Sequence, residues 1–129
     1  MSYVFAVRLT GRAVEIEPDR YWLEARSDTE EIAARGTLEV WEDGSLVESG
    51  EISFGPDDRL TYRARGAFGS TTTPTARHGT AVLEVTGGTG KFADARGYVT
   101  SNFLLSIDGE LTDHHYGLLH LKQERKESV

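Results

Sequence analysis

The sequence predicts an all-β protein whose short antiparallel strands follow one another as a meander. Apolar and polar residues alternate along short runs, which is the pattern of half-buried strands. Turn-forming residues recur about every 8 to 12 residues, a spacing typical of β-sandwiches and β-barrels. Few runs are uniformly apolar, which disfavours parallel βαβ layers. With about eight or nine strands, a closed barrel would enclose just enough space for packed side chains or one small ligand.

The strands expected in the first half of the chain are residues 3–10, 20–26, 36–41 and 46–54. The first alternates aromatic and aliphatic residues and ends at Gly11, and the second follows a Pro-Asp turn. The last two flank Asp43-Gly44, a dipeptide that favours tight hairpin turns. Residues 28–34 are expected to form one helical turn, because Asp28 or Thr29 can cap it and acidic residues follow.

The strands expected in the second half are residues 60–68, 79–86, 92–107 and 111–123. A turn containing Pro56 precedes the first of them, and Asp108-Gly109 joins the last two as a hairpin. Residues 70–75 form a Thr/Pro-rich loop, and residues 124–129 form a solvated tail.

Composition indicates one globular domain, residues 1–129, with 38% hydrophobic and 27% charged residues. The net charge of −7 and the scattered arginines argue against nucleic acid and anionic membranes as partners. The lack of cysteine excludes disulfides and thiolate catalysis. No apolar run is long enough for a transmembrane helix. The N-terminal segment has no basic start and reaches Arg8 too soon for a secretory signal, so a cytoplasmic location is expected.

The most informative segment is the glycine-rich run of residues 85–101. Its glycines permit backbone conformations that a Cβ would forbid, as a phosphate-binding loop also requires. Such a loop would open a helix, whereas Tyr98 and the residues after it have strand chemistry. The segment therefore predicts a turn between two β-strands and no nucleotide site.

This segment resembles the signature stretch of the dirigent proteins and the related turn of the allene oxide cyclases. The resemblance lies in Gly87-Gly88-Thr89-Gly90-Lys91-Phe92 and, two residues later, Ala95-Arg96-Gly97-Tyr98. It implies an eight-stranded antiparallel closed barrel, usually trimeric, with a central apolar pocket that steers a reactive small molecule toward one ring closure or coupling. Plant dirigent proteins are secreted, and the allene oxide cyclases have an acid in the first strand. Neither feature is found here, so the chain is more similar to small bacterial cyclases of polyketide pathways.

The resemblance implies that Arg96 lines the pocket, and alternation gives Tyr98 and Asn102 the same face. A buried guanidinium would hold a carbonyl or stabilise a developing enolate or phenolate, with Tyr98 assisting. Asn102 is expected to contact the ligand. The alternative for Arg96 is an ordinary surface arginine paired with Asp94 or a neighbouring glutamate.

The last strand gives His114 and Tyr116 one face, and His115 the other. His114 is a candidate acid or base near neutral pH, and Tyr116 is a candidate hydrogen-bond donor. Satisfied or surface histidines are the commoner case. His114 and His120 are about 20 Å apart along a strand, which excludes a zinc site built from this strand alone. No metal or cofactor is expected.

Aromatic residues at alternate positions supply candidate ligand contacts, although such stripes more often form plain core. These candidates are Tyr3, Phe5, Trp41, Tyr62 and Phe68. Trp41 shares a face with Glu39, which would be a pocket carboxylate if Trp41 points inward. We favour the solvent side for Glu39.

The leading functional hypothesis is a cofactor-independent cyclase or isomerase that holds a small apolar substrate, polyketide-like or oxylipin-like, near attack geometry. The alternatives are a lipocalin-like carrier without turnover and a structural module filled by its own side chains. A homo-oligomer, trimer or dimer, is also expected, because the face of Val99, Ser101 and Phe103 is too apolar to leave in water.

Overall fold

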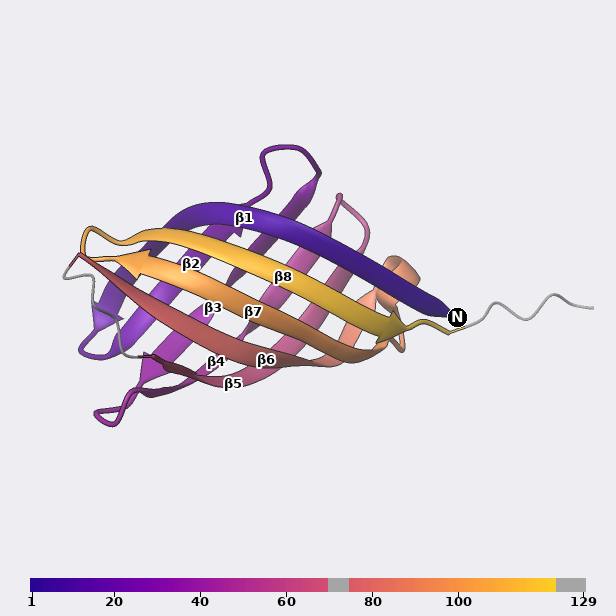
Figure 1. Cartoon of the computed structure of the whole chain (residues 1–129). Helices are drawn as coiled ribbons and strands as arrows, with labels where there is room; N and C mark the ends of the chain where they lie inside the picture. The colour runs from indigo at the N-terminus through magenta and orange to yellow at the C-terminus, as the bar shows by residue number, and fades with distance from the viewer. Residues whose placement is uncertain (70–74, 123–129) are drawn as a thin grey trace, which may run out of the picture.

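Eight antiparallel strands form one closed barrel in the order of the chain, with each strand paired to the next and the last paired to the first (Figure 1). This is a computed structural model, and it describes residues 1–69 and 75–122. The elements are β1 (Ser2–Glu17), β2 (Arg20–Arg26), β3 (Ile32–Val40), β4 (Ser45–Phe54), β5 (Arg59–Phe68), β6 (Ala76–Thr89), the 3₁₀ turn η1 (Gly90–Phe92), β7 (Arg96–Ser106) and β8 (Glu110–His120). The predicted all-β closed barrel is confirmed.

Strand β1 closes the barrel because its two halves pair with different neighbours. Residues 2–12 pair with β8, and residues 10–17 pair with β2. The sequence predicts an end to the first strand at Gly11, but the strand continues to Glu17. Gly11 instead lets β2 approach closely, since a Cβ there would lie 1.8 Å from the carbonyl oxygen of Glu24.

The helical turn expected over residues 28–34 is wrong. The Ser27 hydroxyl accepts hydrogen bonds from the backbone N–H groups of Thr29, at 3.2 Å, and Glu30, at 3.1 Å. This side chain completes a local turn that ends within a few residues, after which Ile32 pairs with Phe54 as β3 begins. The expected tail and residues 70–74 of the expected loop lie outside the described residues, as does Gln123 of the last expected strand.

The glycine-rich segment joins β6 to β7, which pair antiparallel as predicted. Gly90 has a φ of 61°, and a Cβ there would lie 2.1 Å from the Asp58 carboxylate. That carboxylate accepts a hydrogen bond of 2.9 Å from the backbone N–H of Lys91. Phe92 was expected to open the next strand, but it lies in η1 and is fully buried.

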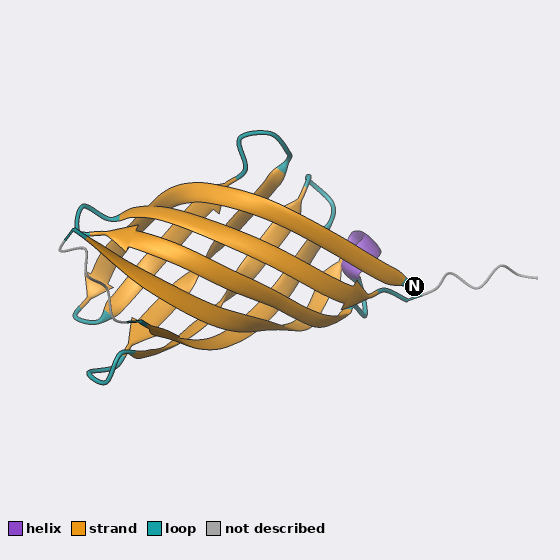
Figure 2. Ribbon diagram, viewed as in Figure 1, coloured by secondary structure: helices purple, strands orange, loops and turns teal. Residues whose placement is uncertain are grey.

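Side chains on the inward face of every strand form the core. The described elements are strands apart from η1, as Figure 2 shows. The largest fully buried side chains include Leu9, Leu38, Leu46, Ile52, Leu60, Leu83, Val99 and Leu119. No helix in the described part of the chain has the length and apolar character to cross a membrane.

Aromatic side chains close the barrel end at which η1 lies. We call this group the aromatic cap; it comprises Tyr3, Phe5, Phe54 and Phe92. Their ring centroids are 4.8–6.3 Å apart in tilted or edge-to-face pairs. The ammonium group of Lys91 lies 4.8 Å from the centre of the Tyr3 ring.

Candidate functional site

Polar side chains gather inside the otherwise apolar barrel. We call them the interior cluster: Glu48, Tyr62, Ser101, Asp113 and His115. They come from β4, β5, β7 and β8, so the cluster exists only when the barrel is assembled. Glu48 pairs in register with Leu38 and Ala64, both buried. Buried polar groups require hydrogen-bond partners, and the hydrogen bonds described for these five side chains are made within the cluster.

The phenol of Tyr62 donates a hydrogen bond to the carboxyl group of Glu48. Two glycines make space for this phenol: a Cβ on Gly36 or Gly50 would lie 3.0 or 2.9 Å from its oxygen. As a residue Glu48 is half-buried, but its carboxyl group is enclosed by the barrel. The sequence places glycines opposite a tyrosine, and this arrangement brings phenol and carboxyl together.

Burial raises the pKa of Glu48 to about 7, and the negative charge of Asp113 acts in the same direction. The Tyr62 hydrogen bond and the nearby His115 oppose the increase. Burial and the Glu48 carboxylate raise the pKa of Tyr62 well above its ordinary value. At neutral pH, therefore, Glu48 can gain or lose a proton while Tyr62 remains a donor.

The second half of the cluster is a Ser101–Asp113–His115 chain. The Asp113 carboxylate accepts a hydrogen bond of 2.6 Å from the Ser101 hydroxyl and lies 2.9 Å from Nε2 of His115. Alternation gives Asp113 and His115 the same inward face, and Ser101 pairs with His115 across β7 and β8.

The other ring nitrogen of His115, Nδ1, is buried and has no partner among the described residues. A carboxylate beside Nε2 favours the tautomer in which Nε2 carries the hydrogen, and this leaves a lone pair on Nδ1. His115 is 2% exposed, so this acceptor is withdrawn from bulk water. Such an atom is suited to accept a proton or hydrogen bond from a bound molecule.

The two halves of the cluster act on each other electrostatically, since Asp113 and His115 both affect the pKa of Glu48. Titratable groups whose properties are shifted by burial and by one another are typical of acid–base sites. Within the described residues, no three His, Asp or Glu side chains come together as a metal site would require.

The structure places Arg96, Tyr98, Asn102, His114 and Tyr116 on the outside of the barrel, so their expected position in the pocket is wrong. Tyr98 and Tyr116 are each 58% exposed. Alternation groups these residues correctly but does not say which group faces inward. The inward positions of β7 are taken by apolar and small residues, which lose less on leaving water than an arginine does.

The face of Val99, Ser101 and Phe103 was expected to contact another subunit, and this is also wrong. All three residues are buried within the barrel itself. Their apolar character is therefore explained by the core of a single chain.

The ligand-contact candidates divide between the two faces. Tyr62 is 3% exposed, and Tyr3, Phe5 and Phe68 pack against the core. Trp41 was expected to face the ligand, but it lies in the turn after β3 and is 49% exposed. Glu39 lies on the outside, as favoured, with its carboxylate 3.2 Å from Arg20.

Sequence reasoning missed Glu48, Ser101, Asp113 and His115 as site residues. The available signal was parity: Glu48 alternates with Leu46 and Ile52, and Asp113 and His115 alternate with Leu111 and Leu119. An ionisable residue at an inward position between leucines is costly to bury, and that cost identifies it as a candidate.

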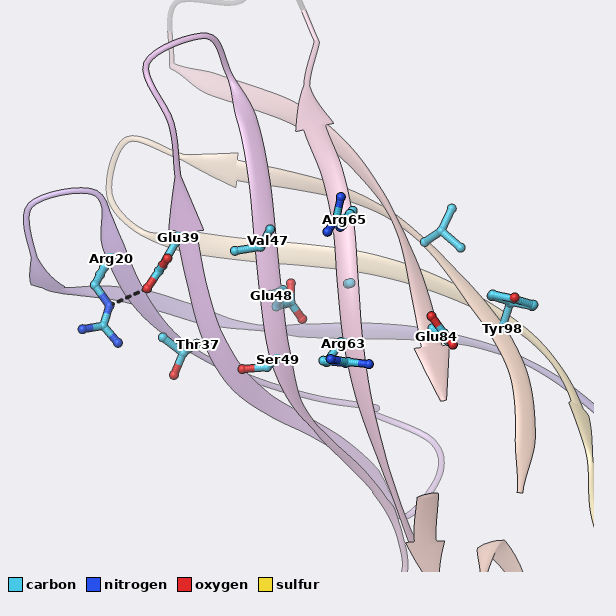
Figure 3. A pocket seen from close by; sticks show the side chains of 12 residues that line it. Arg20, Thr37, Glu39, Val47, Glu48, Ser49, Arg63, Arg65, Glu84 and Tyr98 are labelled. Carbon is cyan, nitrogen blue, oxygen red and sulfur yellow. Dashed lines mark ion pairs between the residues drawn. The ribbon is translucent and has the colours of Figure 1, made fainter. Parts of the chain in front are cut away.

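A groove of about 610 Å³ is lined by residues of β2–β7 (Figure 3). Most of its charged side chains come from the outward face and have both signs: Arg20, Glu39, Arg63, Arg65 and Glu84. Glu48 of the interior cluster also lines this groove, whereas Tyr62, Ser101, Asp113 and His115 do not. We therefore take the interior cluster as the candidate site.

No protein-family model matches the sequence, and no curated protein matches it. Among solved structures, the chain is similar to the pterocarpan synthase dirigent protein GePTS1. The TM-score is 0.62 at 16% sequence identity, and the match covers 95% of this chain and 92% of that chain. The chain thus has a dirigent-like barrel fold, which confirms the fold that the resemblance of residues 87–98 implies. At this identity the likeness concerns the fold alone.

Proposed function

We propose that the protein is a cofactor-independent cyclase or isomerase that moves protons to and from a small, mostly apolar molecule inside the barrel. The observation that carries this proposal is the interior cluster. A carboxyl group with a pKa of about 7 and an imidazole with an unpartnered nitrogen lie in the same apolar interior. The dirigent protein of similar fold is named a pterocarpan synthase, which is in keeping with a ring-forming barrel.

In the proposed reaction, His115 Nδ1 takes a proton from a hydroxyl group or an acidic carbon of the substrate. Asp113 keeps the imidazole in the required tautomer and stabilises its protonated form. Protonated Glu48 returns a proton to the atom that gains electrons as the new bond forms, and Tyr62 holds its carboxyl group in place. One proton leaves the substrate and one is added, so substrate and product are isomers and no oxidant is needed.

The apolar lining contributes in two ways. It restrains a flexible substrate near attack geometry, which can contribute several kcal/mol to a ring closure. It also excludes water, so the charges that develop on the substrate interact with fixed groups of the cluster.

A suitable test uses 2′-hydroxychalcone, whose closure to flavanone needs only proton transfer and is followed by loss of absorbance. We expect the wild type to accelerate closure, and His115→Gln and Glu48→Gln to lose about a hundredfold or more of that acceleration while still binding the probe. His114→Gln is the matched control, since this neighbour of His115 faces outward. Arg96→Ala should also leave the rate unchanged.

The alternative is a carrier that binds small apolar molecules without converting them. It would use the same interior, which is lined by leucine and aromatic side chains. Binding of the chalcone by the wild type without any acceleration would favour the carrier. Equal acceleration by the wild type and His115→Gln would overturn the acid–base role of the cluster.

A further inference from the structure

We propose that a groove on the outside of the barrel docks a short acidic peptide segment of a partner protein, and that Arg26 and Arg59 each hold one carboxylate of that segment. The groove has a volume of about 580 Å³ and is lined by residues of β1–β5. We call it the arginine groove. No residue of the interior cluster lines it, so the proposal stands or falls independently of the proposed function.

The floor of the arginine groove is a row of outward side chains from four neighbouring strands. Arg26 pairs in register with Ala33. Ala33 pairs with Ser53, and Ser53 pairs with Arg59. The two small side chains therefore lie between the two arginines, which leaves space above them. Neighbouring strands are about 4.8 Å apart, so the backbones of Arg26 and Arg59 are about 14 Å apart along the sheet.

The next row of outward side chains balances its own charges. Arg12 pairs in register with Glu24, which also pairs with Arg35. Arg35 in turn pairs with Glu51, and its Nη2 lies 2.5 Å from Oε1 of that carboxylate. Arginine and glutamate alternate along this row in equal number, so it adds no net charge to the groove.

The net positive charge of the groove comes from the floor row. None of the ion pairs between described residues includes Arg26. Arg59 lies 3.7 Å from Glu51, but this carboxylate has a closer partner in Arg35. The chain as a whole has a net charge of −7, so this patch is positive on a negative protein. It attracts acidic groups that the rest of the surface repels.

The spacing of the two arginines favours a ligand with two acidic groups over a ligand with one. A single anion would have to draw both guanidinium groups toward the middle of the floor, and Arg59 would leave Glu51. Two carboxylates spaced like the arginines can contact both without such movement. In an extended peptide, acidic side chains at positions i and i+4 lie on one face about 13 Å apart. Small residues between them fit over Ala33 and Ser53.

Acidic residues beside the groove limit the length of the ligand. They lie within residues 28–31, which follow Arg26, and at residues 57–58, which precede Arg59. None of them lines the groove. A long polyanion such as a nucleic acid would extend past the floor and meet their repulsion, whereas a short segment stays above the arginines. We therefore assign a short peptide segment to the groove.

Trp22 provides a reporter for binding. It lines the groove and is 37% exposed, whereas Trp41, the other tryptophan of the chain, lies in the turn after β3 and outside this lining. The test follows Trp22 fluorescence of the full chain carrying Trp41→Phe, at low salt. Two blocked peptides of the same composition are compared. Acetyl-Glu-Ala-Ser-Ala-Glu-amide has its carboxylates four positions apart, and acetyl-Ala-Glu-Glu-Ala-Ser-amide has them adjacent.

We expect the first peptide to bind at least about fivefold more tightly than the second, and added salt to weaken its binding. Arg26→Gln and Arg59→Gln should each weaken it by about three- to fivefold. Both arginines are exposed, so these variants should keep the fold. Arg65→Gln is the matched control, because it removes the same charge from the outward face of β5 at a position outside the groove.

Equal binding of the two peptides would overturn the assignment of spaced carboxylates. Equal weakening by Arg65→Gln would attribute the binding to net charge alone and overturn the site. A single-stranded oligothymidylate is titrated in the same way, and tighter binding of it would overturn the peptide in favour of nucleic acid. No change in Trp22 fluorescence with either peptide up to about 10 mM would overturn the proposal as a whole.

Discussion

Tyr62 and Glu48 share a hydrogen bond inside the barrel although their strands bring Tyr62 opposite Gly50, two residues away from Glu48. The phenol reaches the carboxyl group diagonally, across a position that has no side chain. This relationship joins an acid whose pKa lies near neutrality to a donor that keeps its hydrogen.

Replacement of Glu48 by Gln should change how stability depends on pH. The unfolded carboxyl titrates near its ordinary pKa of 4.5 and the folded one near 7, so between these values the folded state keeps a proton that the unfolded state has lost. The contribution of Glu48 to the free energy of unfolding therefore falls as pH rises from 4.5 through 7, by on the order of 3 kcal/mol. Urea unfolding of wild type and Glu48→Gln from pH 4 to 9 measures this contribution as the difference between their free energies of unfolding. A difference that stays constant over this range would contradict the raised pKa.

Replacement of Gly50 by Ala should destabilise the barrel. A Cβ there would lie 2.2 Å from the Arg35 carbonyl oxygen and 2.7 Å from the Cα of Gly36, so the backbone of β3 must shift as well as the Tyr62 phenol. We expect a loss of about 3 kcal/mol in the free energy of unfolding. Ser49→Ala, at the neighbouring outward position, is the control and should change it little. Equal losses of unfolding free energy in Gly50→Ala and Ser49→Ala would contradict the close approach of Gly50 to Gly36.

Replacement of Asp113 by Ala should lower the free energy of unfolding by about 3 kcal/mol, because Ser101 and His115 lose the hydrogen-bond partner that they share inside the barrel. Asp113→Asn should retain most of the stability but reverse the tautomer of His115, since the amide donates to Nε2 and the hydrogen moves to Nδ1. Nitrogen NMR of the imidazole distinguishes the two tautomers. His114→Ala is the outward-facing control. The same tautomer in wild type and Asp113→Asn would count against the proposed role of Asp113.

An oligomer stays a prediction, now for a different surface from the one that the sequence indicated. Val4, Leu118 and Tyr98 lie side by side on the outside of β1, β8 and β7, and they are 73%, 52% and 58% exposed. Sedimentation equilibrium should show association that Leu118→Lys weakens. Ile107→Lys, at an exposed turn, is the control. A monomer at tens of micromolar in the wild type would contradict the prediction.

Much of the fold follows from local signals in the sequence. The turns at Asp43-Gly44 and Asp108-Gly109 separate strands as predicted, and β2 has the predicted bounds. Gly11 was misread because a glycine that ends a strand and one that allows a neighbouring strand to approach look the same in sequence. Their difference depends on β2, which the local pattern does not place.

The site was harder to predict because a strand has two faces with the same period. Arg96 was assigned to the interior because of the resemblance. With this choice, the residues of β7 and β8 that in fact face outward were predicted to line the pocket. The opposite choice, based on the cost of exposing Val99, Phe103 and Leu119, leads to Asp113 and His115 directly. Parity also singles out Glu48, but its interaction with Asp113 and His115 depends on how the barrel closes, which no local pattern contains.

The pairing of β1 with β8 has a consequence for how the chain is made. Residues 2–12 cannot pair with residues 110–120 until β8 has been synthesised, so the growing sheet has two unpaired edges. Until β8 emerges, those edges are open to other chains, and the long loop that must close makes the final step slow. Early ribosomal release or truncation of β8 should therefore yield aggregates, and a chaperone that shields β1 and β7 would protect the newborn polypeptide.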